Sequence, residues 1–95
     1  MAVAVVMDFE GATLDQYDEV VANMGFSSGG PGAPISLFHW VTATDGGIRV
    51  VDVWERQEDY EQFAADKIGP LSVAAGFPGP PKRKFVDVHS YLTAG

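Results

Sequence analysis

Two apolar runs that flank Asp45-Gly46-Gly47 constrain the fold of this chain more than any other feature. An Asp-Gly pair between such runs is a strong signal for a β-hairpin. The second run ends at Trp54, and the acidic residues Glu58 and Asp59 follow, where the positive end of a helix dipole favours negative charge. Residues 35–63 therefore predict a strand, a tight turn, a second strand and a helix.

The turn sets the register of the hairpin. If Asp45-Gly46 forms a two-residue turn, His39 faces Asp52; if Gly46-Gly47 forms it, His39 faces Trp54. In both registers His39, Asp52 and Trp54 share one face, because side chains alternate along a strand. A three-residue loop would break this relation. The opposite face is apolar and carries Phe38, Trp40, Val51 and Val53.

The residues before the hairpin predict a strand, a helix and a loop. Residues 2–9 are apolar at both odd and even positions, so both faces of the strand would be apolar, which is typical of a central strand covered on both sides. Residues 13–24 predict a helix that starts with a capping box, Thr13 to Gln16, and carries an apolar stripe that includes Tyr17. Residues 26–34 predict a loop, which is either a plain connector, the simpler interpretation, or a flap over a pocket.

The residues after the hairpin predict a second helix and a last strand. The second helix starts near Gln57 and carries Tyr60 on its inward stripe, and Gly69-Pro70 is expected to interrupt it before a short segment that ends at Gly76. Residues 77–84 predict a stiff connector with half of the basic residues, either a solvated entrance to a strand or a patch that steers an acidic ligand. Apolar and polar residues alternate in residues 85–93, which predicts the last strand, and His89 shares the face of Phe85 on this strand.

Composition narrows the functional classes. Ninety-five residues predict one domain, residues 1–95. A net charge of −7 disfavours nucleic acid and anionic membrane surfaces as partners. The absence of cysteine excludes disulfides and thiol chemistry. An acid at Asp8 argues against a signal peptide, so we expect a soluble, cytoplasmic protein.

The order strand, helix, strand, strand, helix, strand is the ferredoxin-like, split βαβ pattern of an α+β domain. Right-handed crossovers place both helices on one face of a four-stranded antiparallel sheet. The other face would be bare and apolar, and a second copy of the chain is expected to cover it as a homodimer.

The chain also resembles the dimeric α/β-barrel superfamily, and within it the small proteins grouped with the antibiotic-biosynthesis monooxygenases. The residues that carry the resemblance are Val53-Trp54-Glu55, Tyr60, Phe63 and Pro70. It implies a dimer joined through the sheets and a pocket between each sheet and its helices. Some members oxidise aromatic polyketides without metal or flavin, and others cyclise polyketides, isomerise lactones or degrade haem. The haem degraders use a first-strand Asn where this chain has Met7 and Asp8, and a helix His that it lacks.

His39 and Asp52 are the best candidate catalytic pair. A carboxylate beside an imidazole fixes its tautomer and suits it to act as a general base near neutral pH. The competing interpretation is a structural cross-strand pair. Trp54, Tyr17 and Tyr60 are candidate substrate-binding residues, with core packing as the alternative, and His89 either joins them or lies at the dimer face.

No metal or cofactor is expected. His39, His89 and Asp52 match a two-His-one-carboxylate triad in composition only, and no nucleotide or zinc motif occurs. The sequence therefore predicts a small homodimeric enzyme that acts on an aromatic or polyketide-like molecule. The reaction would be cofactor-independent oxygenation, cyclisation or isomerisation. The alternative is a non-catalytic dimeric small-molecule-binding or stress-related protein of the same fold.

Overall fold

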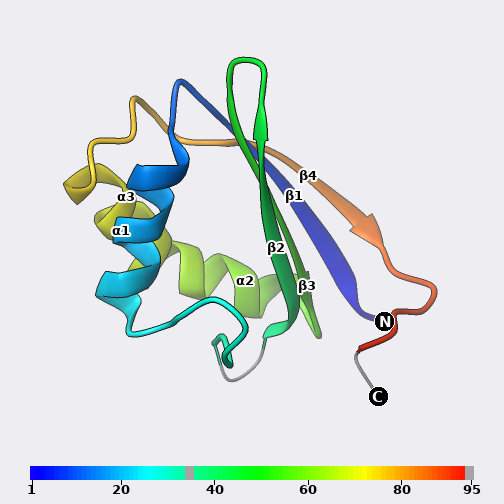
Figure 1. Ribbon diagram of the computed structural model, residues 1–95. Coiled ribbons are helices and arrows are strands. Elements are labelled where there is room, and N and C mark those ends of the chain that lie inside the picture. The colour runs from blue at the N-terminus through cyan, green and yellow to red at the C-terminus, as the bar shows by residue number, and fades with distance from the viewer. Residues whose placement is uncertain (34–35, 94–95) are drawn as a thin grey trace.

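The sheet and the helices form two layers (Figure 1). The computed structural model describes residues 1–33 and 36–93, so Pro34 of the predicted loop and Ile35 of the predicted strand lie outside the described residues. The four-stranded antiparallel sheet has the order β2-β3-β1-β4. The elements are β1 (Val3–Glu10), α1 (Leu14–Met24), β2 (Ser36–Thr44), β3 (Gly47–Trp54), α2 (Gln57–Phe63), a π-helical turn (Ala64–Ile68), α3 (Gly69–Ala74) and β4 (Lys82–Asp87). All the helices lie against one face of the sheet, as the ferredoxin-like prediction requires.

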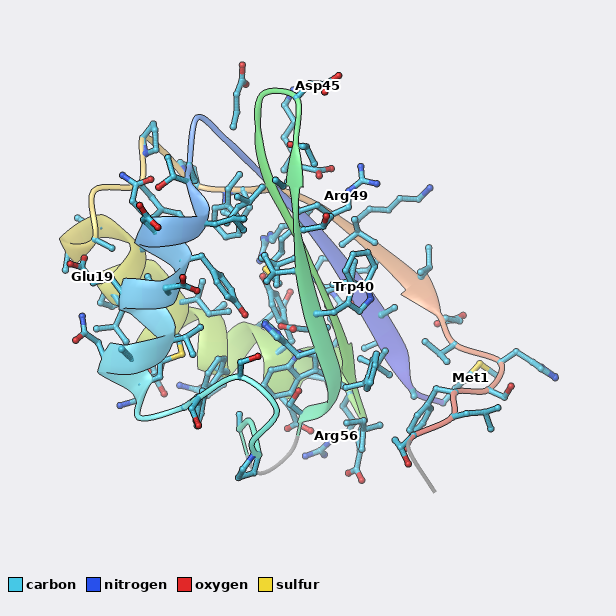
Figure 2. All side chains as sticks on the ribbon, viewed as in Figure 1. Met1, Glu19, Trp40, Asp45, Arg49 and Arg56 are labelled. Carbon is cyan, nitrogen blue, oxygen red and sulfur yellow. The ribbon has the colours of Figure 1, made fainter. Side chains whose placement is uncertain are left out.

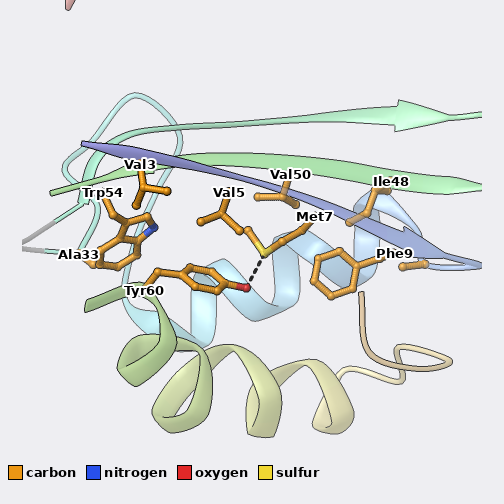
Figure 3. Close-up of a cluster of buried hydrophobic side chains, with 10 residues drawn as sticks. Val3, Val5, Met7, Phe9, Ala33, Ile48, Val50, Trp54 and Tyr60 are labelled. Carbon is orange, nitrogen blue, oxygen red and sulfur yellow. Dashed lines mark hydrogen bonds between the residues drawn. The ribbon is translucent and has the colours of Figure 1, made fainter. Parts of the chain in front are cut away.

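Strand β1 lies between β3 and β4, which confirms the prediction of a central strand. Its alternate residues Val3, Val5, Met7 and Phe9 are buried toward the helices and form the middle of the hydrophobic core (Figure 3). Burial of this kind is the main source of stability in a small domain.

The hairpin has the register expected for a two-residue turn at Asp45-Gly46. Thr44 pairs with Gly47 and His39 pairs with Asp52, with one irregularity in β2 between Ser36 and Phe38. The end of β1 also reaches this turn, because the Gly11 N–H donates to the Gly46 carbonyl at 2.7 Å. A Cβ at Gly47 would lie 2.0 Å from the Phe9 carbonyl oxygen. Gly47 therefore permits β1 and β3 to approach closely.

Helix α1 begins with the predicted capping box. The Gln16 N–H donates to the Thr13 hydroxyl at 3.1 Å, and the Thr13 N–H donates to the Gln16 amide oxygen at 3.0 Å. Gly25 ends the helix with a φ of 84°, the left-handed conformation that glycine adopts at low cost. The Gln16 amide also donates to the Gly76 carbonyl at 3.0 Å, which ties α1 to the end of α3.

The second helical run differs from the prediction in how it accommodates Pro70. The sequence predicts an interruption at Gly69-Pro70, but the chain stays helical through a π-helical turn, in which the Gly69 N–H donates to the Ala64 carbonyl. Pro70 then lies in the first turn of α3, the part of a helix that tolerates proline best. The π-helical turn thus replaces the expected break.

The prediction of the last strand is wrong at both ends. Strand β4 spans Lys82–Asp87 and not residues 85–93. Lys82 pairs with Asp8, and Asp87 pairs with Val3, the first residue of β1. Beyond Asp87, within the described residues, only the Val88 N–H still bonds this edge, to the Ala2 carbonyl at 2.9 Å. Residues 88–93 alternate but extend past Val3, where β1 begins, so β1 offers them no partner.

The face of the sheet away from the helices has an apolar part and a charged part. Phe38, Trp40 and Val86 are 45, 44 and 41% exposed, which agrees with the predicted parity of the bare face. Arg49 donates two hydrogen bonds to Asp8, at 2.8 and 3.1 Å, and these hold the pKa of the Asp8 carboxyl below its usual value. Figure 2 shows Trp40 and Arg49 on this side of the sheet.

No helix within residues 1–33 and 36–93 has both the length and the apolar character needed to cross a lipid bilayer.

Candidate functional site

A cavity of about 780 Å³ lies between the helix-facing side of the sheet, α1, the loop after α1 and the second helical run. This volume falls within the range of roughly 300–1,000 Å³ that is usual for small-molecule sites. The lining is largely apolar and includes Met7, Val20, Met24, Val41, Val50, Trp54, Phe63 and Phe77. The segment 26–33, for which the sequence favours a plain connector, forms part of the wall.

Three polar side chains converge at the cavity. Strand β2 supplies His39, the paired position on β3 supplies Asp52, and α1 supplies Tyr17. The His39 Nδ1 contacts the Asp52 Oδ1, and the His39 Nε2 contacts the Tyr17 hydroxyl. The Asp52 side chain is 5% exposed and that of His39 is 39% exposed, so the carboxylate is the buried end of the chain of hydrogen bonds.

The chemistry of the three groups determines the direction of the hydrogen bonds. A carboxylate only accepts, so the imidazole donates to Asp52 through its Nδ1–H. A neutral imidazole then accepts at Nε2, and the Tyr17 hydroxyl donates to that atom. This is the hydroxyl–imidazole–carboxylate order of a Ser-His-Asp triad, with a phenol in place of the serine.

Tyr17 stays protonated at neutral pH. Its burial, together with the negative charges of Asp52 and Asp18, raises the pKa of the phenol to about 12. Its ring stacks on that of His39, with 5.9 Å between the centroids and 12° between the planes. Tyr17 is therefore a neutral hydrogen-bond donor held in a fixed orientation.

Trp54 lines the cavity and is 1% exposed. Its ring packs against those of Tyr60 and Phe63, with centroids 6.1 and 5.3 Å away. Among the described residues, the buried indole N–H finds no hydrogen-bond acceptor. An unsatisfied buried donor of this kind costs about 1–3 kcal/mol of stability.

The lining carries acidic but no basic charge. Asp18 and Asp52 border the cavity, and none of the described lining residues is a lysine or an arginine. An anionic ligand would meet the negative charge of Asp18 with no lysine or arginine among the described lining residues to offset it. The site therefore favours neutral ligands.

Two of the predicted substrate-binding residues lie apart from this group. The Tyr60 hydroxyl donates to the Met7 sulfur at 3.2 Å within the core, and its residue is 1% exposed (Figure 3). Burial raises the pKa of this phenol. His89 is exposed beyond the end of β4 and does not border the cavity. Within residues 1–33 and 36–93, no three His, Asp or Glu side chains gather in a way that could hold a metal ion.

The sequence interpretation missed several lining residues. Val20, Val21 and Met24 share the stripe of Tyr17 on α1, so the same periodicity marks them. Ser72 on α3 is 7% exposed and borders the cavity, and no sequence pattern distinguishes it.

The fold and the cavity together define a ferredoxin-like α+β protein with a ligand-sized site between sheet and helices. A solved structure with this fold is the monooxygenase from the gene ActVA-Orf6 of Streptomyces coelicolor, in complex with the ligand nanaomycin D. The match has a TM-score of 0.53 and 24% identity, and it covers 99% of this chain and 92% of that one. No protein-family model matches the sequence, and a search of curated proteins also finds no match.

At 24% identity this likeness shows the fold. It confirms the predicted fold class and the predicted resemblance to the monooxygenase group at the level of architecture.

Proposed function

We propose that this protein is a homodimeric enzyme that takes a proton from a flat, neutral, aromatic or polyketide-like molecule and thereby starts a cofactor-independent oxygenation, cyclisation or isomerisation. The observation that carries the proposal is the chain of hydrogen bonds from Asp52 through His39 to Tyr17, which ends at an apolar cavity. The monooxygenase of the same fold, which is solved with nanaomycin D, supports the ligand class by analogy.

The ligand class follows from the shape and charge of the cavity. Its volume suits a molecule of a few fused rings, and its wall offers the partly exposed rings of Phe63 and Phe77 for stacking. A carboxylated analogue should bind more weakly than the neutral parent because no cation lines the described part of the wall.

In the proposed mechanism, His39 is the base that receives the proton. Asp52 holds the ring in the tautomer that leaves Nε2 free of hydrogen, and it stabilises the imidazolium once the proton arrives. The ligand loses a proton from a phenol or an activated carbon and becomes an anion. The apolar surroundings keep water away from this anion, and the nature of the ligand then decides which of the three reactions follows.

The homodimer is proposed from the bare face of the sheet. Phe38 and Trp40 on the edge strand β2, and Val86 on the opposite edge strand β4, expose a large fraction of their apolar surface. The apolar residues Val51 of β3 and Val6 of β1 lie between these two edges on the same face. A contiguous apolar patch of this kind is costly in water, and a two-fold related copy presents a matching patch.

The test uses dithranol, a flat tricyclic phenol with an acidic C–H bond, and follows oxygen consumption and quinone formation. The variant is His39→Ala, and His89→Ala on the exposed tail is the matched control. We expect His39→Ala to lose about 10²–10⁴-fold in turnover while the dimer persists, because this is the usual contribution of a general base. Turnover equal to that of the wild type would remove His39 from the mechanism.

The second candidate is a non-catalytic ligand-binding protein of the same fold. It is favoured by one observation: both ring nitrogens of His39 are already engaged, by Asp52 and by Tyr17. In that case His39→Ala would lower the melting temperature or dissociate the dimer, and no probe would turn over. Native mass spectrometry of the purified protein separates the candidates further, since it reports a dimer and any retained small molecule together.

A further inference from the structure

The hydrogen bonds of His39 leave no ring nitrogen available to a ligand. Nδ1 contacts Asp52, and Nε2, the atom that would act as the base, contacts the Tyr17 hydroxyl. A ligand in the cavity would therefore displace Tyr17 from the imidazole or meet the Tyr17 oxygen in place of it.

The position of Tyr17 favours the second outcome. Its backbone belongs to α1, which the capping box and the bond from Gln16 to Gly76 hold in place. Its ring stacks on His39, and its residue borders the cavity. When a neutral imidazole accepts at Nε2, the Tyr17 hydroxyl donates its hydrogen there, and its oxygen retains lone pairs that can accept a hydrogen bond from a ligand.

We propose that Tyr17 is the catalytic residue that contacts the ligand's acidic group and relays its proton to His39. The inference rests on the proposed function. In this relay the ligand O–H bond breaks and its proton passes to the Tyr17 oxygen. At the same time the Tyr17 O–H bond breaks and that proton passes to His39 Nε2. The products are a ligand anion, a neutral tyrosine and an imidazolium beside Asp52, so charge and protons balance without any further reactant.

The electrostatics of the site agree with a relay and disagree with a resting phenolate. Burial of the ring, together with the negative charges of Asp52 and Asp18, raises the pKa of Tyr17, so the phenol does not act as an ionised base. It can take a proton only if it gives its own away, and His39 is in contact to receive it. His39 then acts through Tyr17, and Asp52 positions His39.

The experiment measures ionisation of a bound phenol and does not depend on turnover. The probe is alizarin, 1,2-dihydroxyanthraquinone, whose visible spectrum changes when its phenol ionises. The pKa of the bound probe is measured in the wild type, Tyr17→Phe and His39→Gln, with Tyr91→Phe on the exposed tail as the matched control. The relay predicts that Tyr17→Phe and His39→Gln each decrease the bound phenolate at neutral pH at least tenfold, and that Tyr91→Phe equals the wild type.

Three results would overturn the inference. If Tyr17→Phe keeps the wild-type ionisation and His39→Gln loses it, His39 contacts the ligand directly. If neither variant changes it, the hydrogen-bond chain takes no part. If the wild type does not bind the probe, the proposed function fails together with the relay. In the first two results the wild type does bind the probe, so a binding measurement separates them from this third one.

A second variant keeps the test valid if Tyr17→Phe does not fold. Incorporation of 3,5-difluorotyrosine at position 17 retains the ring and the hydroxyl but makes the hydroxyl a stronger donor. The relay predicts a larger fraction of phenolate than in the wild type, because the donor to the bound anion is stronger. An unchanged fraction would show that the hydroxyl does not touch the ligand.

Discussion

Replacement of Trp40 by glutamate should dissociate the proposed dimer. Trp40 lies on the face of the sheet away from the helices and is 44% exposed (Figure 2). Because a tryptophan buries up to about 250 Å², this fraction corresponds to roughly 110 Å². At ~25 cal/mol per Å² its burial contributes about 2.7 kcal/mol per protomer. Two-fold symmetry repeats the contact, so the dimer loses about 5 kcal/mol.

This loss weakens the dimer by roughly 10³–10⁴-fold, since each ~1.4 kcal/mol is a factor of ten in the dissociation constant. Desolvation of the new carboxylate adds to it. The assay is sedimentation velocity over a range of protein concentrations, with Val73→Glu as the control, because Val73 is 77% exposed on α3 behind the sheet. A wild-type monomer, or a Trp40→Glu dimer within tenfold of the wild-type dissociation constant, would refute the reasoning.

Three further predictions concern the stability of the fold. Thr13→Ala removes the hydroxyl of the capping box and should lower the free energy of unfolding by about 1 kcal/mol. This loss lowers the melting temperature by roughly 4–8 °C in a domain of this size, whereas Thr13→Ser keeps a hydroxyl and should retain most of the wild-type stability. Gly47→Ala places a Cβ 2.0 Å from a backbone oxygen of β1, whereas in Gly46→Ala the Cβ meets no atom within 4 Å. Chemical denaturation should therefore show Gly47→Ala clearly destabilised and Gly46→Ala close to the wild type. The contact with Arg49 lowers the pKa of Asp8, so its contribution to stability is present above the ordinary carboxyl pKa of 3.8 and is lost as the pH falls through the lowered value. The urea concentration at the unfolding midpoint should therefore fall less steeply at acid pH for Asp8→Asn than for the wild type. The same decrease at acid pH in both proteins would contradict this prediction.

Local signals in the sequence were sufficient for the hairpin and for α1. The turn at Asp45-Gly46 and the capping box at Thr13 depend on residues that are close together in the chain, and the structure confirms both. The alternation of side chains also predicted that His39 and Asp52 share one face in either register of the hairpin, and the structure makes them direct partners.

Features that depend on distant residues were not predictable in the same way. Strand β4 ends at Asp87 because its partner β1 begins at Val3. The sequence of residues 85–93 does not itself indicate where the strand ends. Tyr17 and Tyr60 occupy equivalent inward stripes, yet the Tyr17 hydroxyl meets His39 and that of Tyr60 meets the Met7 sulfur. The packing of each helix on the sheet decides between these two outcomes.

The π-helical turn between α2 and α3 makes this segment tolerant of a change in length by one residue. Each residue of an α-helix turns the chain by about 100°, and a π-helical turn holds one residue more than the α-helical turn it replaces. A chain that lacked one residue between Ala64 and Ile68 could close this turn with α-helical geometry, so α3 would keep the same side toward the sheet and Ser72 would keep its place at the cavity wall. The π-helical turn is thus the point at which related chains could lose one residue from this helical run without altering the core or the cavity.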